Sequence, residues 1–180
     1  MSARKIVKNQ LPRATKMLTA SVLKQDITKR AKSPPIFTSI VIRPSESKNS
    51  IFNLVNLGLW DQTVHLREGL PAEYVSEMSD ALDMTRASFL DNLQLPRSTI
   101  EARIKNKTPL TSAEGGAVLR TAKALAKAED VFEDHVAATR WFKREIRSLG
   151  GMTPLSLMDT ACGFELVMKT LGRIEYGVVA

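Results

Sequence analysis

The chain has 180 residues, of which 43% are hydrophobic and 25% are charged, and its formal net charge is +7. This length accommodates one domain or two small ones with a buried core. No apolar run approaches the roughly 18 to 20 residues that span a bilayer, and the N-terminus lacks the apolar stretch of a secretory signal, so we expect a cytoplasmic protein without a membrane partner.

The positive charge is concentrated at the N-terminal end. Residues 1–50 hold 11 Lys and Arg against 2 acids, a net +9, whereas residues 51–180 hold 15 against 17, a net −2. The breaker-rich stretches KSPP and RPSESKNS bracket a short β-like run, Ile36–Ile42, and a weak helix is predicted between Arg13 and Arg30. We expect an irregular basic arm over residues 1–50, which either contacts nucleic-acid phosphates or is a solvated tail.

From Ile51 onward the apolar residues follow a helical period, and no strand pairing is expected. A first helix is predicted from Ile51 to a stop at Gly69–Pro71. The second is predicted to place four apolar residues on one face, and the third, capped by Thr85, to bring three together. These residues are Tyr74, Val75, Met78 and Leu82 in the second helix and Phe89, Leu90 and Leu93 in the third.

Two capping boxes are predicted next, Ser98 with Glu101 and Thr111 with Glu114. The helix between them turns Ile100 and Ile104 inward. It leaves an outward face made of Arg97, Ser98, Glu101, Ala102 and Lys105. The second box opens a long helix that reaches Phe132.

The last part of the chain is predicted to hold three further helices. The first carries Val136, Trp141 and Ile146 inward and continues to Gly150–Gly151. Thr153 caps the next, and Gly163 separates it from the last. The last helix shows Phe164, Val167, Leu171 and Ile174 at helical spacing and closes at Gly177. The expected fold class is therefore all-α.

The residues needed for catalysis are scarce. The single Cys162 excludes an internal disulfide, and His65 and His135 are too few to hold a metal ion. Both histidines are expected at the surface and Cys162 packed beside a helix break. Gly115–Gly116 lies inside a capped helix, which favours close helix packing over phosphate binding. We expect no catalytic residue, no metal and no cofactor, and hence no enzyme.

The stretch TRASFLDNLQLPRSTIEARI fits the helix-turn-helix plan, in which the second helix enters the major groove of DNA. An ordinary corner between two helices of a bundle is the alternative. Arg97, Arg103, Lys105 and Lys107 favour DNA, because cations on and beyond this helix could contact the phosphates that flank the groove.

Three stretches then follow one another in a distinctive order. They are LREGLPAEYVSEMSDALDMTRASFLDNLQLPRSTIEARIKNKTPLT, TAKALAKAEDVFEDHVAATRW and GGMTPLSLMDTACGFELVMKTLGRIEYGVVA. Over residues 55–180 this order resembles the Xre/MbcA/ParS antitoxins, most specifically at LGRIEYG. The resemblance implies an Xre-like helix-turn-helix domain, here residues 51–133, that dimerises and represses its own operon. It also implies a small helical domain, here residues 134–180, that binds a RES-domain toxin, an NAD-consuming enzyme, and obstructs its active-site cleft.

Two sets of site residues are expected on these grounds. The DNA-binding set is Arg97, Ser98, Thr99, Glu101, Ala102, Arg103, Lys105 and Lys107. The toxin-binding set, matched to LGRIEYG and the residues after it, is Arg173, Glu175, Tyr176, Gly177, Val178, Val179 and Ala180. An apolar ending is understandable if a partner covers it. For Ile174 and Tyr176, packing within the domain is the alternative.

The expected partners are operator DNA, the RES-domain toxin and a second copy of the chain, with a higher hetero-oligomer formed with the toxin. The alternative function is a stand-alone helix-turn-helix transcriptional regulator or an adaptor. Its C-terminal helices would then bind some other protein.

Overall fold

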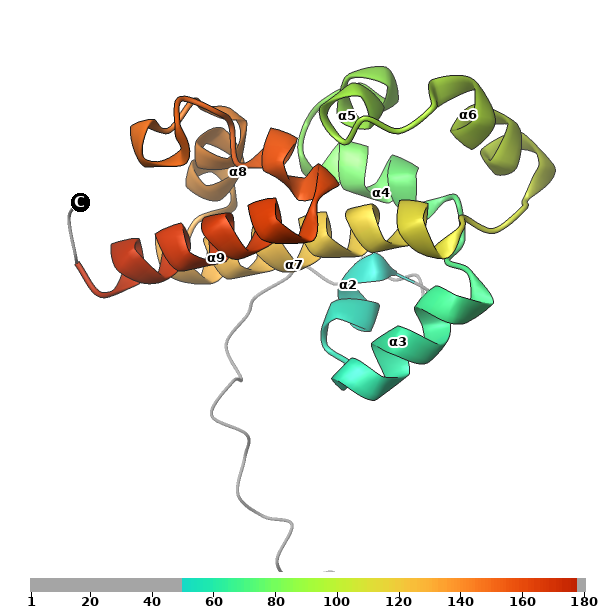
Figure 1. Cartoon of the computed structure of the whole chain (residues 1–180), viewed down its shortest axis with the longest axis horizontal. Helices are drawn as coiled ribbons and strands as arrows, with labels where there is room; N and C mark the ends of the chain where they lie inside the picture. The colour runs from blue at the N-terminus through green and yellow to red at the C-terminus, as the bar shows by residue number, and fades with distance from the viewer. Residues whose placement is uncertain (1–49, 178–180) are drawn as a thin grey trace, which may run out of the picture. The chain divides into compact units, whose positions relative to one another are not determined.

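The computed structural model describes residues 50–177, so the predictions for the basic arm and for Val178–Ala180 lie outside the described residues. Short turns join the elements (Figure 1). The α-helices are α2 (Ile51–Val55), α3 (Leu59–Glu68), α4 (Tyr74–Ala81), α5 (Arg86–Asn92), α6 (Arg97–Asn106), α7 (Ser112–Phe132), α8 (His135–Lys143) and α9 (Ala161–Glu175). The 3-10 helices are η1 (Arg147–Leu149) and η2 (Leu155–Asp159). Within residues 50–177 the one β-type pairing is an isolated bridge between Ile146 and Met152. The all-α prediction is confirmed.

The long helix α7 is the element against which most others pack. Its predicted capping box is present: the N–H of Glu114 donates to Thr111 Oγ1 at 3.3 Å, and the N–H of Thr111 donates to Glu114 Oε2 at 2.7 Å. The helix contacts α2, α3 and α4 from the earlier part of the chain and α8, η2 and α9 from the later part. Gly115 allows close packing, as predicted, since a Cβ there would lie 3.2 Å from Leu70 Cγ.

The segment 51–68 forms two helices, and the single helix predicted there is wrong. The chain leaves the helical path after Val55 and starts α3 with Gly58 as its N-cap. Gln62 satisfies the backbone at this break, because its buried Nε2 donates to Val55 O at 3.0 Å and to Leu57 O at 2.8 Å.

The helices from α4 to α6 follow the predicted pattern except at one cap. The apolar residues predicted to face inward on α4 and α5 are buried, and Thr85 Oγ1 accepts the N–H of Ser88 at 3.2 Å. The predicted Ser98 capping box is wrong, because α6 begins at Arg97 with Pro96 as its N-cap and no side-chain cap bond. Proline needs no N–H partner and holds φ at −70°, so it starts the helix ahead of the serine.

The helix α8 is shorter than predicted and buries a different face. It ends at Lys143 because Arg144 is extended, with φ −96° and ψ 146°, so the expected continuation to Gly150 is wrong. The buried residues are Ala138, Thr139 and Phe142, while Val136 is 59% exposed. The prediction joined apolar residues five positions apart, a spacing that does not return to the same side of a helix.

Gly163 lies inside α9 and does not divide it, so that predicted break is wrong. The break falls at Thr160, the N-cap, whose Oγ1 accepts the N–H of Gly163 at 3.0 Å. A Cβ on Gly163 would stand 2.0 Å from the carbonyl oxygen of Leu157. Glycine is required here because η2 and α9 approach too closely for a side chain. Cys162 beside it is exposed, not packed as predicted.

One hydrophobic core extends through the described residues. Its fully buried side chains include Phe89 of α5, Phe142 of α8 and Leu171 of α9, which belong to a single cluster of contacts. Arg120 of α7 adds a polar link, since it donates to Met158 O at 3.1 Å and to the next carbonyl, of Asp159, at 2.8 Å. Burial lowers the pKa of Arg120, and the Asp159 carboxylate opposes this shift.

Candidate nucleic-acid and protein-binding surfaces

The helices α5 and α6 form a two-helix unit around buried apolar side chains. Phe89, Leu90 and Ile100 are completely buried at its centre. In the turn, Gln94 has a φ of 53°, the left-handed conformation that glycine adopts more readily, and the N–H of Leu95 donates to Leu90 O at 2.9 Å. The chain therefore makes the tight turn of a helix-turn-helix unit without a glycine.

Most residues of the predicted DNA-binding set lie at the surface. Exposed members are Arg97, Ser98, Thr99, Ala102, Lys105 and Lys107, and half-buried members are Glu101 and Arg103. The outward face predicted for α6 agrees with this arrangement. The structure brings the whole set onto one helix and the residue that follows it.

Several of these charges are paired within the chain. The guanidinium of Arg97 contacts the Asp91 carboxylate across the turn, and Arg86 Nε lies 3.3 Å from Glu101 Oε1. The side chains of these pairs are 44% to 53% exposed. Exposed pairs contribute only about 0.2–1 kcal/mol, so Arg97 can exchange its carboxylate for a phosphate at little cost.

Arg103 points back to the protein. Its Nη1 donates to Pro109 O at 2.9 Å, and its Nε lies 3.4 Å from Glu114 Oε2 at the start of α7. Lys105 and Lys107, by contrast, form no ion pair with any residue of 50–177. Lys105 and Lys107 are therefore the unpaired cations of this set among the described residues, and Arg97 is held only by an exposed pair with Asp91.

The outer face of α9 carries apolar and basic side chains together. Leu166 is 52% exposed, Ile174 40% and Tyr176 81%. Lys169 and Arg173 are exposed beside them and form no ion pair with the described residues. An exposure of 81% excludes the alternative that the Tyr176 ring packs within the domain.

Two other members of the predicted toxin-binding set shape the end of α9. Glu175 accepts a hydrogen bond from Lys127 Nζ at 2.9 Å, so its carboxylate is already engaged within the chain. Gly177 has a φ of +65° and its N–H donates to Ile174 O at 3.1 Å, which ends the helix. The remaining three members, Val178–Ala180, lie beyond the described residues.

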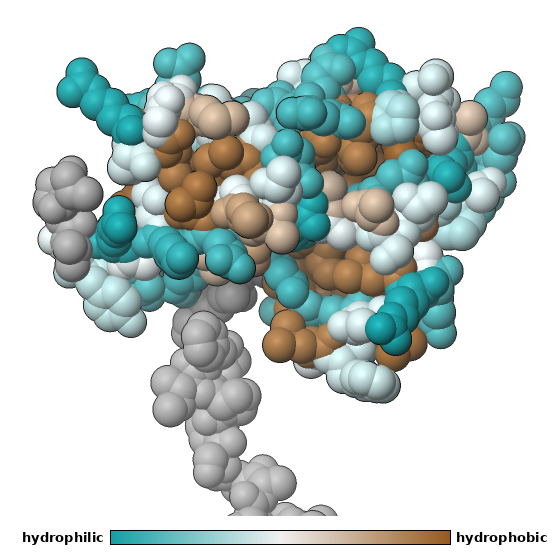
Figure 2. All heavy atoms as spheres, in the orientation of Figure 1, coloured by the Kyte–Doolittle hydropathy of each residue, from teal (hydrophilic) through white to brown (hydrophobic). Residues whose placement is uncertain are grey.

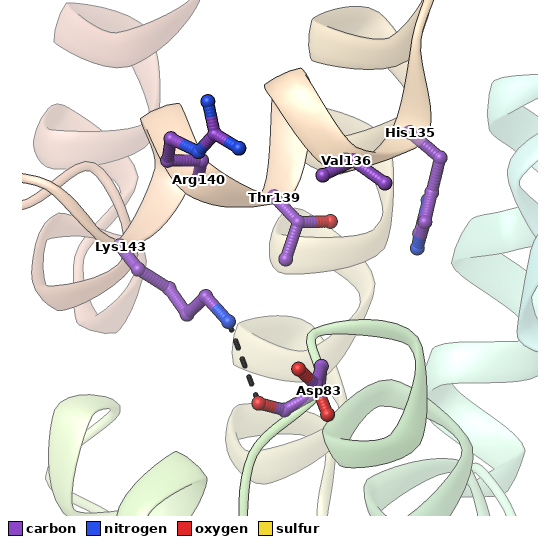
Figure 3. Close-up of a pocket in the computed structure, with 6 residues that line it drawn as sticks. All are labelled: Asp83, His135, Val136, Thr139, Arg140 and Lys143. Atoms are coloured by element: carbon purple, nitrogen blue, oxygen red, sulfur yellow. Dashed lines mark hydrogen bonds between the residues drawn. The ribbon is translucent and has the colours of Figure 1, made fainter.

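An open hollow between α8 and the turn after α4 was missed by sequence reasoning. It measures about 270 Å³ and is lined by Asp83, His135, Val136, Thr139, Arg140 and Lys143 (Figure 3). Lys143 Nζ spans it, donating to Leu82 O at 2.8 Å and Asp83 O at 3.4 Å. The partners of Lys143 lie some 60 positions away, which no local pattern reveals.

An exposed apolar patch covers the start of α3. Leu57 is 43% exposed, Leu59 76% and Trp60 74%, three large side chains within four positions. Figure 2 shows hydrophobic side chains at the surface around α2 and α3. Clusters of this kind on a protein surface commonly mark a contact with another macromolecule.

Comparison with known proteins identifies the family of two segments of the chain. Residues 61–125, which hold α5 and α6, match the Antitoxin Xre-like helix-turn-helix domain, and residues 127–177 match the Antitoxin Xre/MbcA/ParS C-terminal toxin-binding domain. An Antitoxin Xre of Photorhabdus laumondii is 33% identical over 116 residues, covering 64% of this chain and 78% of the relative. An Antitoxin Xre of Pseudomonas putida is 32% identical over 83 residues, which are 46% of this chain and 52% of that relative.

A more distant relative carries a different name. The Prs ADP-ribosylating antitoxin of a Sphingobium species is 26% identical over 124 residues, covering 64% of this chain and 78% of the relative.

Among residues 50–177 no helix has the length and apolarity needed to cross a membrane. The family consists of regulators and inhibitors that act by binding and not by catalysis. The chain belongs to the Xre family of antitoxins, with a helix-turn-helix segment for DNA and a C-terminal segment that binds a toxin.

Proposed function

We propose that this antitoxin neutralises a RES-domain toxin that degrades NAD, by covering the active-site cleft of that toxin with its C-terminal end. The observation that supports this is the placement of Tyr176, which is 81% exposed at the end of α9 and borders the apolar residues Val178–Ala180. Tyrosine and arginine are enriched among the residues that dominate binding energy at interfaces, and Arg173 lies beside Tyr176 without an ion partner among the described residues.

Co-expression tests this proposal. The reading frame beside the gene for this chain should stop growth and deplete cellular NAD when expressed alone, and the full antitoxin should restore both. If labelled NAD instead transfers its ADP-ribose to a protein, as the name of the Sphingobium relative suggests for that system, NAD degradation is not the toxic step. A neighbour with no effect on growth would favour a stand-alone regulator or adaptor.

Tyr176→Ala should weaken binding of the isolated toxin by about 30-fold, the loss typical of a tyrosine that anchors an interface. Removal of Val178–Ala180 should also reduce growth rescue, because these residues would extend into the cleft. Calorimetric titration measures the affinity, and operator binding by the same variants is the control. Unchanged affinity for both variants would show that the C-terminal end is not the toxin contact.

We also propose that α6 binds operator DNA and represses the antitoxin operon. The three available cations, Arg97, Lys105 and Lys107, lie on or directly after a helix whose first residues are exposed. In a helix-turn-helix unit the exposed start of the second helix meets base edges, while flanking cations meet phosphates. Arg103 is left out of this role because it bonds Pro109 O and lies beside Glu114.

Lys105→Ala with Lys107→Ala should weaken operator binding and reduce the salt dependence of the affinity. Each lost phosphate contact lowers the slope of log K against log salt by about 0.9, so the pair should lower it by about 1.8. Gel shifts over a salt series measure this. Arg144→Ala with Arg147→Ala removes the same charge outside the helix-turn-helix segment and should leave the slope unchanged. Equal effects of both pairs would mean that only the overall charge matters.

The chain is further proposed to act as a homodimer, with the patch of Leu57, Leu59 and Trp60 as the contact between copies. The patch borders the segment that matches the helix-turn-helix domain, and such proteins commonly bind two half-sites as dimers. Light scattering measures the mass of the full chain and of a Leu59→Ser, Trp60→Ser variant. A dimer that becomes a monomer in the variant supports this contact, and a monomer in both proteins contradicts it.

A further inference from the structure

The last turn of α9 is linked to α7 by an ion pair. Leu171 is the last fully buried side chain of the helix, and Arg173, Ile174 and Tyr176 beyond it are exposed. Figure 1 shows α9 lying along α7, and the two helices are in contact. In this last turn Glu175 Oε1 lies 2.9 Å from Lys127 Nζ. This Lys127–Glu175 pair is named the α7–α9 clasp.

The clasp is partly shielded from water and is supported by a third charge. The side chain of Lys127 is 22% exposed and that of Glu175 36%, and Asp130 Oδ2 lies 3.2 Å from the same Nζ. Desolvation alone would lower the pKa of Lys127, but hydrogen bonds to Glu175 and Asp130 outweigh it and raise the pKa. Because the pKa of Lys127 is raised in the folded chain, its pairing with Glu175 and Asp130 stabilises the fold at neutral pH. This stabilisation is lost only as the pH rises through the raised pKa.

The clasp lies directly before the proposed toxin contact. The N–H of Tyr176 donates to Gly172 O at 3.1 Å, and that of Gly177 donates to Ile174 O at 3.1 Å. These bonds fix Tyr176 and Gly177 to the last turn of α9. The direction in which Tyr176 and the residues after it leave the domain is therefore set by where that last turn lies.

We infer that Glu175 serves neutralisation as a positioning residue, acting through Lys127, and does not contact the toxin itself. This inference rests on the proposed function, in which Tyr176 and its neighbours form the toxin contact. Glu175 Oε1 accepts from Lys127 Nζ, so the interaction that the structure shows for this carboxylate is one within the chain. Holding the last turn in place before binding lowers the ordering cost of the complex, which is how a residue outside the interface raises affinity.

Charge reversal on the full-length chain tests the inference. Lys127→Glu and Glu175→Lys each replace attraction by repulsion and should weaken affinity for the isolated toxin by about fivefold. The double variant, Lys127→Glu with Glu175→Lys, restores an opposite pair and should return affinity to within about twofold of the original. The control Asp130→Asn removes the neighbouring charge but keeps the Lys127–Glu175 pair, so it should weaken affinity less than either charge reversal does.

The outcomes separate the two proposals. If Glu175→Lys weakens binding, Lys127→Glu does not, and the double variant stays weak, Glu175 contacts the toxin directly and the inference is wrong. If the reversals unfold the chain, Lys127→Met and Glu175→Gln replace them: equal losses that do not add support the clasp, and additive losses overturn it. If Tyr176→Ala and removal of Val178–Ala180 both leave the affinity unchanged, the proposed toxin contact fails whatever the clasp variants do.

Discussion

Gly163→Ala should destabilise the folded chain by about 3 kcal/mol, at the upper end of what overpacking usually costs. The added Cβ would stand 2.0 Å from the carbonyl oxygen of Leu157 and 2.9 Å from its carbonyl carbon. Both are backbone atoms of η2, which cannot rotate away as a flexible side chain can. Urea unfolding followed by circular dichroism measures the change.

The matched control for this substitution lies in the same helix. Gly172→Ala places its Cβ where nothing lies within 4 Å. Because alanine favours the helix over glycine, this change should stabilise the chain by about 0.5–1 kcal/mol. Equal effects at the two positions would refute the close approach of η2 and α9.

Phe89→Ala should cost about 3–5 kcal/mol, the usual loss for a phenylalanine completely buried in a core. Phe89 is 0% exposed on α5, and α5 packs against η2 of the toxin-binding segment as well as against α4 and α6. The cavity should therefore weaken both segments at once. Phe52, which is only partly buried, is the control, and Phe52→Ala should cost less.

A single tryptophan can report whether both segments unfold together. In a Trp60→Phe background the fluorescence comes from Trp141 of α8, whose ring centroid lies 5.7 Å from that of Phe132 on α7. After Phe89→Ala the Trp141 signal and the helical signal should shift to one shared midpoint. Two separate midpoints would show that the segments have independent cores.

The elements that the sequence predicted well are those with local signals. Thr85 and Thr111 each accept a backbone N–H within three positions. Thr153 accepts the N–H of Ser156 at 3.1 Å, but the segment that it was predicted to cap is the 3-10 helix η2, with Pro154 as its N-cap. Such a bond needs only a short side chain and a nearby helix start, so the pattern is visible without the fold. The buried faces of α4 and α5 follow from helical spacing in the same way.

The elements that the sequence predicted poorly depend on contacts between residues far apart in the chain or on a competing local signal. In the sequence Gly163 resembles a helix breaker. The reason that the position needs a glycine is the close approach of a carbonyl of η2 in the folded chain. Ser98 resembles a cap, yet Pro96 already starts the helix. No glycine or proline lies near Lys143, where α8 ends. The prediction therefore placed the end of the helix at the next such residues, the glycines at 150 and 151.

The candidate sites show the same division. The exposed side of α6 and the exposure of Tyr176 follow from helical spacing and the family pattern. The pairing of Arg103 with Glu114 and of Glu175 with Lys127 does not, since the partners lie 11 and 48 positions apart. Charge alone cannot tell a free cation from one that is bonded within the protein.

The course of α7 has a consequence for how the antitoxin is removed from a cell. The helix-turn-helix match ends at residue 125 and the toxin-binding match begins at 127, both within this one helix, so the described chain offers no linker there for a protease to cut. A degrading machine that pulls the molecule apart destroys both halves together. The proposed operator binding and the proposed neutralisation of a toxin would then decay with a single half-life, and neither would outlive the other.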